Sequence, residues 1–144
     1  MRQVTVGLIQ LETKLGDKEY NLALAQKKVR EAAEKGARII CLPELFVTGY
    51  NLGAFGERLY DMAEGLSGPA VTALRALAKE LGVYIIAPLA LQVYTTRPLN
   101  NAAVLINDEG EVQACIRKTI CSAASAIILP ARANTPYSRR STAG

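Results

Sequence analysis

The sequence predicts an α/β domain with a mixed sheet and helices on one face of that sheet. Short runs of β-branched and apolar residues alternate with two longer segments in which apolar residues recur at helical spacing. The run Ala37–Leu42 is apolar on both faces, which is typical of a buried parallel strand. Further on, Asp108-Glu109-Gly110-Glu111 separates two apolar runs and predicts a tight hairpin turn. Parallel strands followed by an antiparallel pair make a mixed sheet.

The first three elements form a βαβ unit. Val4–Leu11 is β-branched and apolar, and it is predicted to be a strand. Asp17 then provides a helix N-cap, and the helical spacing of apolar residues continues to Lys35, after which Gly36 ends the helix. Ala37–Leu42 is the second strand. Two strands that a helix joins in this way lie parallel to each other.

The chain continues with one helix and three strands. Ser67 is the expected N-cap of a helix that Pro69 opens and Gly82 ends. The strands expected after it are Val83–Leu91, Leu99–Asn107 and Val112–Arg117. Residues 120–144 differ from the rest, because they are rich in Ala and Ser, contain no acid and show no clear period. Within them, residues 122–129 fit a short helix or strand, and the region beyond is expected to be disordered.

The composition excludes several classes of protein. The chain has 144 residues, of which 50% are hydrophobic and 21% charged, as expected for one globular domain or part of a larger one. No apolar run approaches the ~20 residues that span a bilayer, and the N-terminus lacks the layout of a signal peptide. A cytoplasmic protein is therefore expected. The net charge of +4 arises mainly in residues 119–144. The chain has no basic stripe with interleaved aromatics, so nucleic-acid binding is not expected.

The chain contains no histidine and three cysteines. The lack of histidine removes Ser-His-Asp and Cys-His catalysis and most zinc sites, so a general base must be a carboxylate, a lysine or a tyrosine. The cysteines show no CxxC spacing and predict no disulfide framework. Cys41 and Cys115 lie in predicted strands and are expected in the core. Cys121, three residues after Lys118, is a further candidate nucleophile, but Lys118 is the one nearby group expected to lower the pKa of its thiol.

Glu44 is the first candidate for a chemical role. It lies two residues after the end of the second strand, and ligand sites in open α/β sheets lie just beyond such strand ends. Burial among Leu42, Leu45 and Phe46 is expected to raise the pKa of its carboxyl, which suits a general base near neutral pH. The alternative is a loop glutamate that caps the next helix or pairs with an arginine.

Lys118 is the second candidate, because it follows the last predicted strand and projects from an edge of the sheet. A lysine at such a place can stabilise a developing oxyanion, whereas the alternative is a solvated lysine at a strand end. Gly49 and Gly53 do not have the spacing of a phosphate-binding loop and are expected to permit a tight turn over the site. Asn100-Asn101 opens a strand and is expected to hold a neighbouring loop through side-chain hydrogen bonds.

These segments together resemble the N-terminal half of the nitrilase superfamily, the carbon–nitrogen hydrolases. The matching stretches are VTVGLIQL, Asn21, GARIICLPELFVTGYNLG, LGVYIIAPLAL, LNNAAVLINDEGEV and IRKT. Their order and spacing fit from about residue 2 to Thr119, which is less than half of a typical member. The combination of LPELFVTGY with a downstream RKT is specific.

The resemblance implies a four-layer αββα sandwich, of which this chain would form part, and a Glu-Lys-Cys triad that needs no cofactor or metal. Glu44 corresponds to the general base and Lys118 to the lysine that stabilises the oxyanion. The cysteine attacks the carbon of a small amide, carbamoyl or nitrile substrate, an acyl-enzyme forms, and water hydrolyses it. Members commonly form homo-oligomers through helices on the sandwich face. FVTGYNLG favours the amidase or carbamoyl-amide branches over true nitrilases.

The chain departs from the family after Lys118. Family members carry the nucleophile a few tens of residues later in a Cys-Tyr-Asp-like context, and no such context follows here. Cys121 is too close to Lys118 to occupy that position. The predicted division is therefore a family segment, 1–119, and a non-family tail, 120–144. One hypothesis is a shifted reading frame: ICSAASAIIL can be back-translated so that a start two bases later encodes Leu-Phe-Gly-Ser-Glu-Arg-Tyr-Tyr-Phe, a segment typical of the family.

Three functions remain open from the sequence. The first is an amidase-type enzyme that is truncated before its nucleophile and nearly inactive alone. The second is a non-catalytic binding module, or pseudoenzyme fragment, with the same partial fold. The third is a doubly wound nucleotide-binding domain, against which the missing phosphate loop counts.

Overall fold

The structure, a computed structural model, describes residues 3–55, 58–92, 100–118 and 126–128. Its helices are α1 (Lys18–Glu34), α2 (Leu52–Phe55), α3 (Arg58–Met62) and α4 (Pro69–Leu81). Its strands are β1 (Val6–Leu8), β2 (Ile39–Cys41), β3 (Tyr84–Leu91), β4 (Asn100–Ile106), β5 (Val112–Arg117) and β6 (Ala126–Ile128). Over these residues, no helix has both the length and the apolar composition that crossing a bilayer demands.

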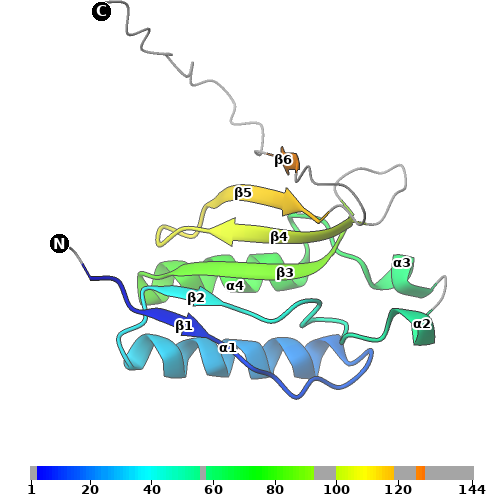
Figure 1. Cartoon of the computed structure of the whole chain (residues 1–144), viewed down its shortest axis with the longest axis horizontal. Coiled ribbons are helices and arrows are strands. Elements are labelled where there is room, and N and C mark those ends of the chain that lie inside the picture. Colours follow the sequence, from blue (N-terminus) through cyan, green and yellow to red (C-terminus); the bar gives the residue numbers. More distant parts are fainter. Residues whose placement is uncertain (1–2, 56–57, 93–99, 119–125, 129–144) are drawn as a thin grey trace, which may run out of the picture.

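The strands form one mixed sheet in the order β1-β2-β3-β4-β5-β6 (Figure 1). β1, β2 and β3 are parallel, and the pairs β3–β4, β4–β5 and β5–β6 are antiparallel. The mixed sheet predicted from the sequence is confirmed. β1 and β2 are shorter than the predicted strands, whereas β5 has the predicted bounds. β6 lies within residues 122–129 and is a strand, and the rest of the segment 120–144 lies outside the described residues.

Helix α1 begins and ends close to the predicted positions. The Asp17 carboxylate caps it by accepting a hydrogen bond from the Tyr20 N–H at 3.0 Å. Its buried residues, Asn21, Ala25 and Val29, follow one another at intervals of four and so form one face. The opposite face is polar and exposed, which places α1 as a cover on the sheet.

Helix α4 begins differently from the prediction. Its N-cap is Gly68, which makes no side-chain bond, so Ser67 is not the cap. A carboxylate oxygen of Glu64 instead accepts the Ala70 N–H at 2.8 Å. The helix ends at Gly82, whose left-handed backbone (φ 61°) costs glycine little. A carboxylate from outside the helix thus satisfies one of the first free amides.

The hydrophobic core lies between one face of the sheet and the helices α1 and α4, which Figure 1 shows on the same side of the strands. The sheet contributes every second residue to it, as the alternation of side chains requires. These residues include Ile40, Ile85, Val104, Ile106 and Cys115. Cys115 is therefore in the core, as predicted. Cys41 is not, because it points to the opposite face and is only partly buried.

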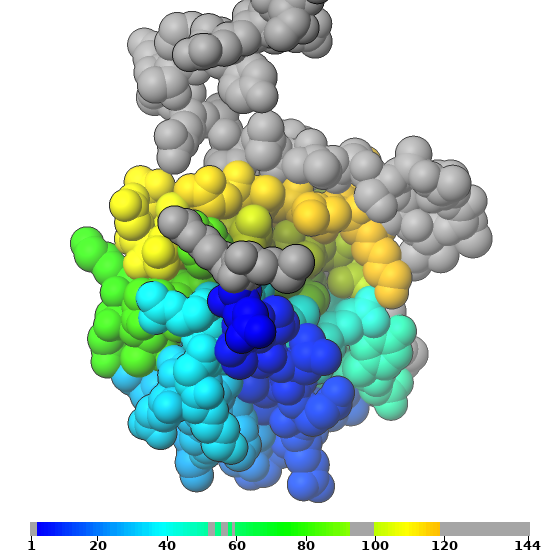
Figure 2. Space-filling model, turned by 60° about the vertical axis from the view of Figure 1, so that its left-hand side comes forward, coloured from blue at the N-terminus to red at the C-terminus, as the bar shows by residue number. Residues whose placement is uncertain are grey.

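The opposite face of the sheet, here called the open face, carries no helix among the described residues. At the end of this face near Glu44 lies a row with the polar residues Asn101 and Lys118 beside Ala90. Three further rows cross the paired strands. The rows are Val6, Ile39 and Tyr84; Leu8, Cys41, Ile86, Leu105 and Ala114; and Pro88, Ala103 and Ile116. Every member is uncharged and apolar apart from the Tyr84 hydroxyl, and Leu8 is 78% exposed. Figure 2 shows β1 (blue) and β5 (orange) on one side of the molecule.

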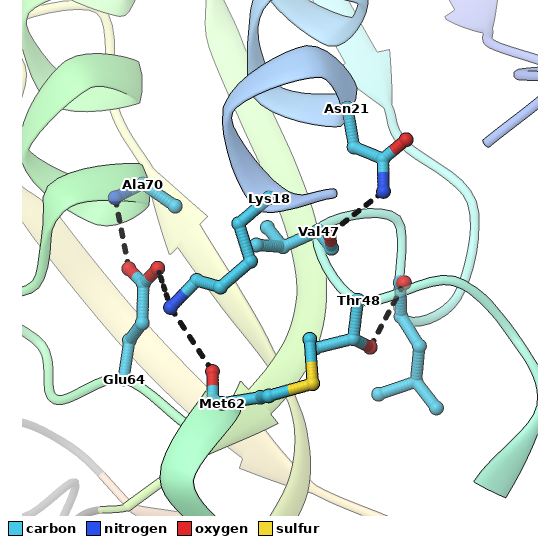
Figure 3. A network of polar contacts seen from close by, with 8 residues as sticks. Lys18, Asn21, Val47, Thr48, Met62, Glu64 and Ala70 are labelled. Carbon is cyan, nitrogen blue, oxygen red and sulfur yellow. Dashed lines mark hydrogen bonds and ion pairs between the residues drawn. The ribbon is translucent and has the colours of Figure 1, made fainter. Parts of the chain in front are cut away.

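A buried acid joins the two long helices to the end of β3. The Glu64 side chain is 5% exposed and pairs with Lys18 Nζ of α1 at 2.6 Å (Figure 3). Lys18 Nζ also donates to the Met62 carbonyl at 3.1 Å. The Glu64 N–H donates to the Ala90 carbonyl, and the Gln92 N–H donates to the Glu64 carbonyl. Each charge of this pair has several partners, which offsets the cost of removing it from water.

We predict that Glu64→Gln lowers the free energy of unfolding by about 2 kcal/mol, because the substitution leaves Lys18 without its counter-charge and weakens the bond to Ala70. Urea denaturation followed by circular dichroism measures this change. The matched control is Glu80→Gln, which removes an ion pair with Arg30 between two exposed side chains and should leave the midpoint almost unchanged. Equal midpoints for the two variants would show that Glu64 is not a structural link.

Candidate active site

Glu44 lies beyond the carboxyl end of β2, in a turn with an uncommon backbone. Pro43 ends the strand, and Leu45 after Glu44 has φ 53°, in the left-handed region that leucine rarely adopts. The Leu45 side chain is nevertheless buried, and its carbonyl accepts the N–H groups of Thr48 and Gly49. The left-handed residue turns the chain sharply, so that Glu44 faces away from the core while Leu45 enters it. Strained backbone of this kind is frequent at functional sites.

Buried hydrogen bonds hold this turn against α1. Asn21 Nδ2 donates to the carbonyl oxygen of Val47 at 2.9 Å (Figure 3) and to that of Lys14 at 2.7 Å. Asn21 Oδ1 accepts the Lys14 N–H at 2.7 Å, and the Gly16 N–H donates to the Thr48 carbonyl at 2.9 Å. Asn21 is completely buried, so water cannot replace these bonds. The position of Glu44 thus depends on the first turn of α1.

Three strands bring the polar side chains of the site together. Glu44 Oε1 accepts hydrogen bonds from Lys118 Nζ at 2.7 Å and from Asn101 Nδ2 at 2.6 Å. Glu44 follows β2, Asn101 is near the start of β4, and Lys118 follows β5. Because β4 is antiparallel to its neighbours β3 and β5, its first residues lie at the same end of the sheet as the last residues of β2 and β5. The Lys118 N–H donates to the Asn101 carbonyl at 2.8 Å, which fixes the two side by side.

An open pocket of about 340 Å³ adjoins this cluster. Glu44, Asn101 and Lys118 line one part of it, and Pro88, Ala103 and Ile116 of the open face line another. The polar and apolar parts are adjacent, an arrangement typical of sites for small molecules. The pocket is accessible to solvent, because the Glu44 and Lys118 side chains are 31% and 58% exposed.

The prediction of a raised pKa for Glu44 is wrong. The hydrogen bond from Lys118 lowers the pKa of this carboxyl, and the bond from Asn101 lowers it further, while burial opposes them. The Leu45 and Phe46 side chains turn into the core, away from the carboxylate, so they do not desolvate it strongly. The bond to Glu44 raises the pKa of Lys118. Glu44 is therefore a carboxylate and Lys118 an ammonium at neutral pH.

These shifts determine how the pair contributes to stability. Since the pKa of Glu44 is lowered by folding, its contribution is complete above the pKa of the unfolded carboxyl and is lost as the pH falls through the folded value. Since the pKa of Lys118 is raised, its contribution is complete below the unfolded value and is lost as the pH rises through the folded one. The pair is therefore intact around neutral pH.

The predicted site residues do not all meet. Glu44 and Lys118 are in contact, which supports the sequence-based pairing of their roles. Cys41 and Cys115 do not line the pocket, and burial raises the pKa of both thiols. Cys121 lies outside the described residues.

Gly49 forms the expected turn with φ 83°, and Gly53 lies in the short helix α2. Among the described residues, no three His, Cys, Asp or Glu side chains group closely enough to hold a metal ion.

Asn101 is the site residue whose role the sequence did not reveal. The prediction of a structural hydrogen bond to a neighbouring loop was right in form, because the bond reaches the turn after β2. The prediction did not identify the acceptor of this hydrogen bond, which is the Glu44 carboxylate itself. The predicted antiparallel hairpin could have indicated this contact, because a hairpin places the start of β4, with Asn101, beside the end of β5, with Lys118.

Comparison with known proteins gives the same family throughout. The profile of the family described as carbon-nitrogen hydrolase matches residues 5–137. A nitrilase of Pyrococcus abyssi is 33% identical over 108 residues, which cover 74% of this chain and 40% of that protein. An N-carbamoylputrescine amidase of Solanum lycopersicum is 34% identical over 119 residues, which cover 82% of this chain and 39% of that amidase. The crystal structure of Nit3 of Saccharomyces cerevisiae, a member of branch 10 of the nitrilase superfamily, superposes with a TM-score of 0.72.

The likeness to Nit3 has 23% sequence identity and covers 81% of this chain and 44% of Nit3, so it shows the fold alone. The nitrilase-like α/β fold expected from the resemblance is confirmed. The chain spans about two fifths of the length of the two relatives that it matches. The family match continues to residue 137, into the segment expected to lie outside the family, and the boundary after Thr119 stays a prediction.

We predict that the Glu44 carboxyl titrates below the usual range of glutamate, because two donors stabilise its ionised form. A carbon-detected NMR titration measures this pKa. Lys118→Met should raise it more than Asn101→Ala does, since the lysine bond is the larger cause. Glu80, whose pKa is lowered by Arg30, serves as the internal reference and should not respond. An unchanged Glu44 pKa in Lys118→Met would contradict the contact.

We also predict that Asn21→Leu destabilises the fold by about 2–3 kcal/mol, because it removes the buried hydrogen bond to the Val47 carbonyl and two partly buried hydrogen bonds to the backbone of Lys14. Urea denaturation gives this value, and the Glu44 carboxyl resonance should move as the turn loosens. The control is Asn51→Ala, which removes an exposed acceptor for the Ala54 N–H. If Asn21→Leu matched this control in stability, the turn would not depend on Asn21.

Proposed function

We propose that this chain, which belongs to the carbon–nitrogen hydrolase family, carries the base and the oxyanion-binding part of a site for hydrolysing non-peptide C–N bonds. Glu44 is the general base, and Lys118 stabilises the oxyanion. One observation carries the proposal: a single carboxylate oxygen of Glu44 receives both Lys118 Nζ and Asn101 Nδ2, at the wall of an open pocket. Asn101 is a positioning residue, because it acts through Glu44.

In the proposed reaction, Glu44 takes the proton of a cysteine thiol, and the thiolate attacks the carbonyl carbon of the substrate. The carbonyl electron pair moves to oxygen, where the Lys118 ammonium stabilises the negative charge. When the C=O bond re-forms, the C–N bond breaks, and the leaving nitrogen takes the proton from Glu44. Glu44 then deprotonates a water that attacks the thioester, and the thiol leaves with that proton.

The low pKa of Glu44 fits this sequence of steps when substrate enters. The carboxylate is ionised at neutral pH, as a base must be, but its bonds make it a weak base in the empty pocket. An oxyanion that draws the Lys118 ammonium away from Glu44 removes the larger of these bonds. The basicity of Glu44 thus increases at the step that needs it, because Lys118 exchanges one anionic partner for another.

The substrate class that we propose is small amides and carbamoyl amides. The pocket of about 340 Å³ combines a carboxylate, an ammonium and an amide with apolar side chains, which suits a compact polar substrate. The relatives are named as a nitrilase and as an N-carbamoylputrescine amidase, so nitriles belong to the wider class. The apolar wall formed by Pro88, Ala103 and Ile116 favours a substrate with an aliphatic part next to its carbonyl group.

Among the residues that the structure describes, the proposed site has no nucleophile. Neither described cysteine lines the pocket, and Cys121 is only three residues beyond Lys118. We therefore propose that the family segment ends near Thr119, before the nucleophile, and that the 144-residue chain has no turnover of its own. A shifted reading frame after codon 118 explains both the unusual composition of residues 120–144 and the missing cysteine context.

A second candidate function is non-catalytic binding. The observation in its favour is that Glu44, Asn101 and Lys118 are arranged beside the pocket although no described cysteine reaches it. Such a chain would bind amide ligands without consuming them. The two functions differ in what restoring the downstream sequence does, because only the truncated enzyme gains activity from it.

The test is to assay release of ammonia from small amides and N-carbamoyl amines by the 144-residue chain, and then by a longer product read in the alternative frame. We expect no release by the first and turnover by the second. In the longer product, Glu44→Gln and Lys118→Met should each lower kcat by about 100-fold or more, since they remove proton transfer and charge stabilisation. Glu80→Gln, distant from the site, is the control and should retain full activity.

Two outcomes would contradict the proposal. Turnover by the 144-residue chain itself, abolished by Cys121→Ser, would make Cys121 the nucleophile and would refute the truncation. A gene whose downstream frames encode no cysteine in a Cys-Tyr-Asp-like context would refute the frameshift. Saturable amide binding without turnover in both products would instead establish the binding function.

A further inference from the structure

We infer that the free edge of β1 is a docking site for an extended acidic peptide, which adds to the sheet as a further strand. β1 is the first strand in the sheet order, so among the described residues only its side toward β2 is paired (Figure 1). A groove of about 380 Å³ lies along this edge, between Thr5–Gln10 and one side of α1. It shares no lining residue with the pocket beside Glu44, so the inference goes beyond the proposed function.

The backbone of β1 is able to pair with a further strand. The carbonyl of Thr5 and the N–H of Ile9 both form hydrogen bonds with the backbone of β2. Because the polar backbone groups of successive residues in a strand point alternately to its two neighbours, those of Val6 and Leu8 point away from β2. An unpaired row of this kind is a template for another strand, and its main-chain hydrogen bonds supply affinity for an extended peptide.

The two sides of such a peptide meet different surroundings. Its side chains point alternately toward α1, where the groove lies, and toward the open face. On the open face, β1 presents Val6 and Leu8, which are 53% and 78% exposed and are suited to apolar cross-strand neighbours. The geometry therefore selects a peptide in which apolar residues alternate with residues of another kind. Thr5–Gln10 spans about 20 Å, which sets the length of the contact.

Three charged side chains of α1 line the groove and determine which residues suit its side of the peptide. Lys28 Nζ pairs with the Glu31 carboxylate at 2.7 Å, so these two charges offset each other. Lys35 also lines the groove, and it makes no ion pair among the described residues. The groove therefore has an excess of positive charge. An acidic side chain of the peptide is attracted to Lys35, whereas a basic one is repelled.

Two other occupants fit the charge of the groove less well. A second copy that paired its own β1 with this edge would bring the lysines of two α1 helices to one groove, where like charges repel. Residues 119–144 contain three arginines and no acid, so their charge has the wrong sign for this site. An acidic peptide from another protein is the occupant that agrees with both the free edge and the excess of positive charge.

The experiment is an NMR titration of the full 144-residue chain, labelled with ¹⁵N, with a capped peptide of about eight residues that alternates valine and glutamate. We expect the amide signals of Val6 and Leu8 to shift and their hydrogen exchange to slow, because their outward N–H groups gain partners. A peptide that alternates valine and lysine should bind at least about fivefold more weakly, since its charge is opposite. Equal binding of the two peptides would overturn the charge argument.

Two pairs of variants separate the backbone contribution from the charge contribution. Leu8→Pro removes an outward N–H without removing a bond to β2 and should abolish binding, whereas Leu8→Ala keeps the N–H and should still bind. Lys35→Glu should weaken binding of the acidic peptide about fivefold or more. Its matched control is Lys79→Glu, which makes the same charge change at an exposed position of α4 outside the groove and should bind normally.

Urea denaturation of each variant shows whether it is folded, and Lys35→Glu keeps the test decisive if Leu8→Pro is not. Unchanged Val6 and Leu8 signals at millimolar acidic peptide would overturn the inference. So would undiminished binding by both Leu8→Pro and Lys35→Glu. Signals of these two residues that shift on dilution of the chain without peptide would assign the edge to a second copy, and would overturn it as well.

Discussion

The antiparallel return of β4 between β3 and β5 is the constraint on which the candidate site depends. In a sheet of parallel strands alone, the start of a strand lies at the opposite edge from the end of its neighbours. Because β4 runs the other way, Asn101 near its start reaches the edge where β2 ends at Glu44 and β5 ends at Lys118. The backbone bond between Lys118 and Asn101 then sets the two donors at the distance at which one carboxylate oxygen accepts both.

Two acids of the chain show how the surroundings decide the role of a carboxylate. Glu64 is almost completely buried, and its oxygens are shared between Lys18 and the start of α4, so it serves the fold. Glu44 also pairs with a lysine, and with the neutral amide of Asn101, but it faces an open pocket and is partly exposed. Its partners can be exchanged for a ligand, whereas those of Glu64 cannot be replaced without opening the protein.

The repetitive elements of the fold could be predicted because their signals are local. The spacing of apolar residues indicated α1 and α4, and short runs of apolar and β-branched residues indicated β3, β4 and β5. The cap of α4 could not be predicted, because Glu64 reaches Ala70 through a turn of the chain that no periodicity describes. For the same reason the pKa of Glu44 was predicted in the wrong direction. The sequence shows its apolar neighbours, but the left-handed Leu45 directs them inward and leaves the carboxylate to Lys118 and Asn101.

The separation of the site residues along the chain has a consequence for folding kinetics. Asn101 is 57 residues from Glu44 and Lys118 is 74 residues from it, so both contacts close long loops. Contacts between distant residues form late, because the entropy of loop closure must be overcome before they contribute. The βαβ unit of β1, α1 and β2 can assemble from nearby residues, whereas the Glu44 contacts must wait until β4 and β5 have paired. During synthesis, the carboxylate therefore emerges long before its partners, and the site becomes ordered only after β5 has paired with β4.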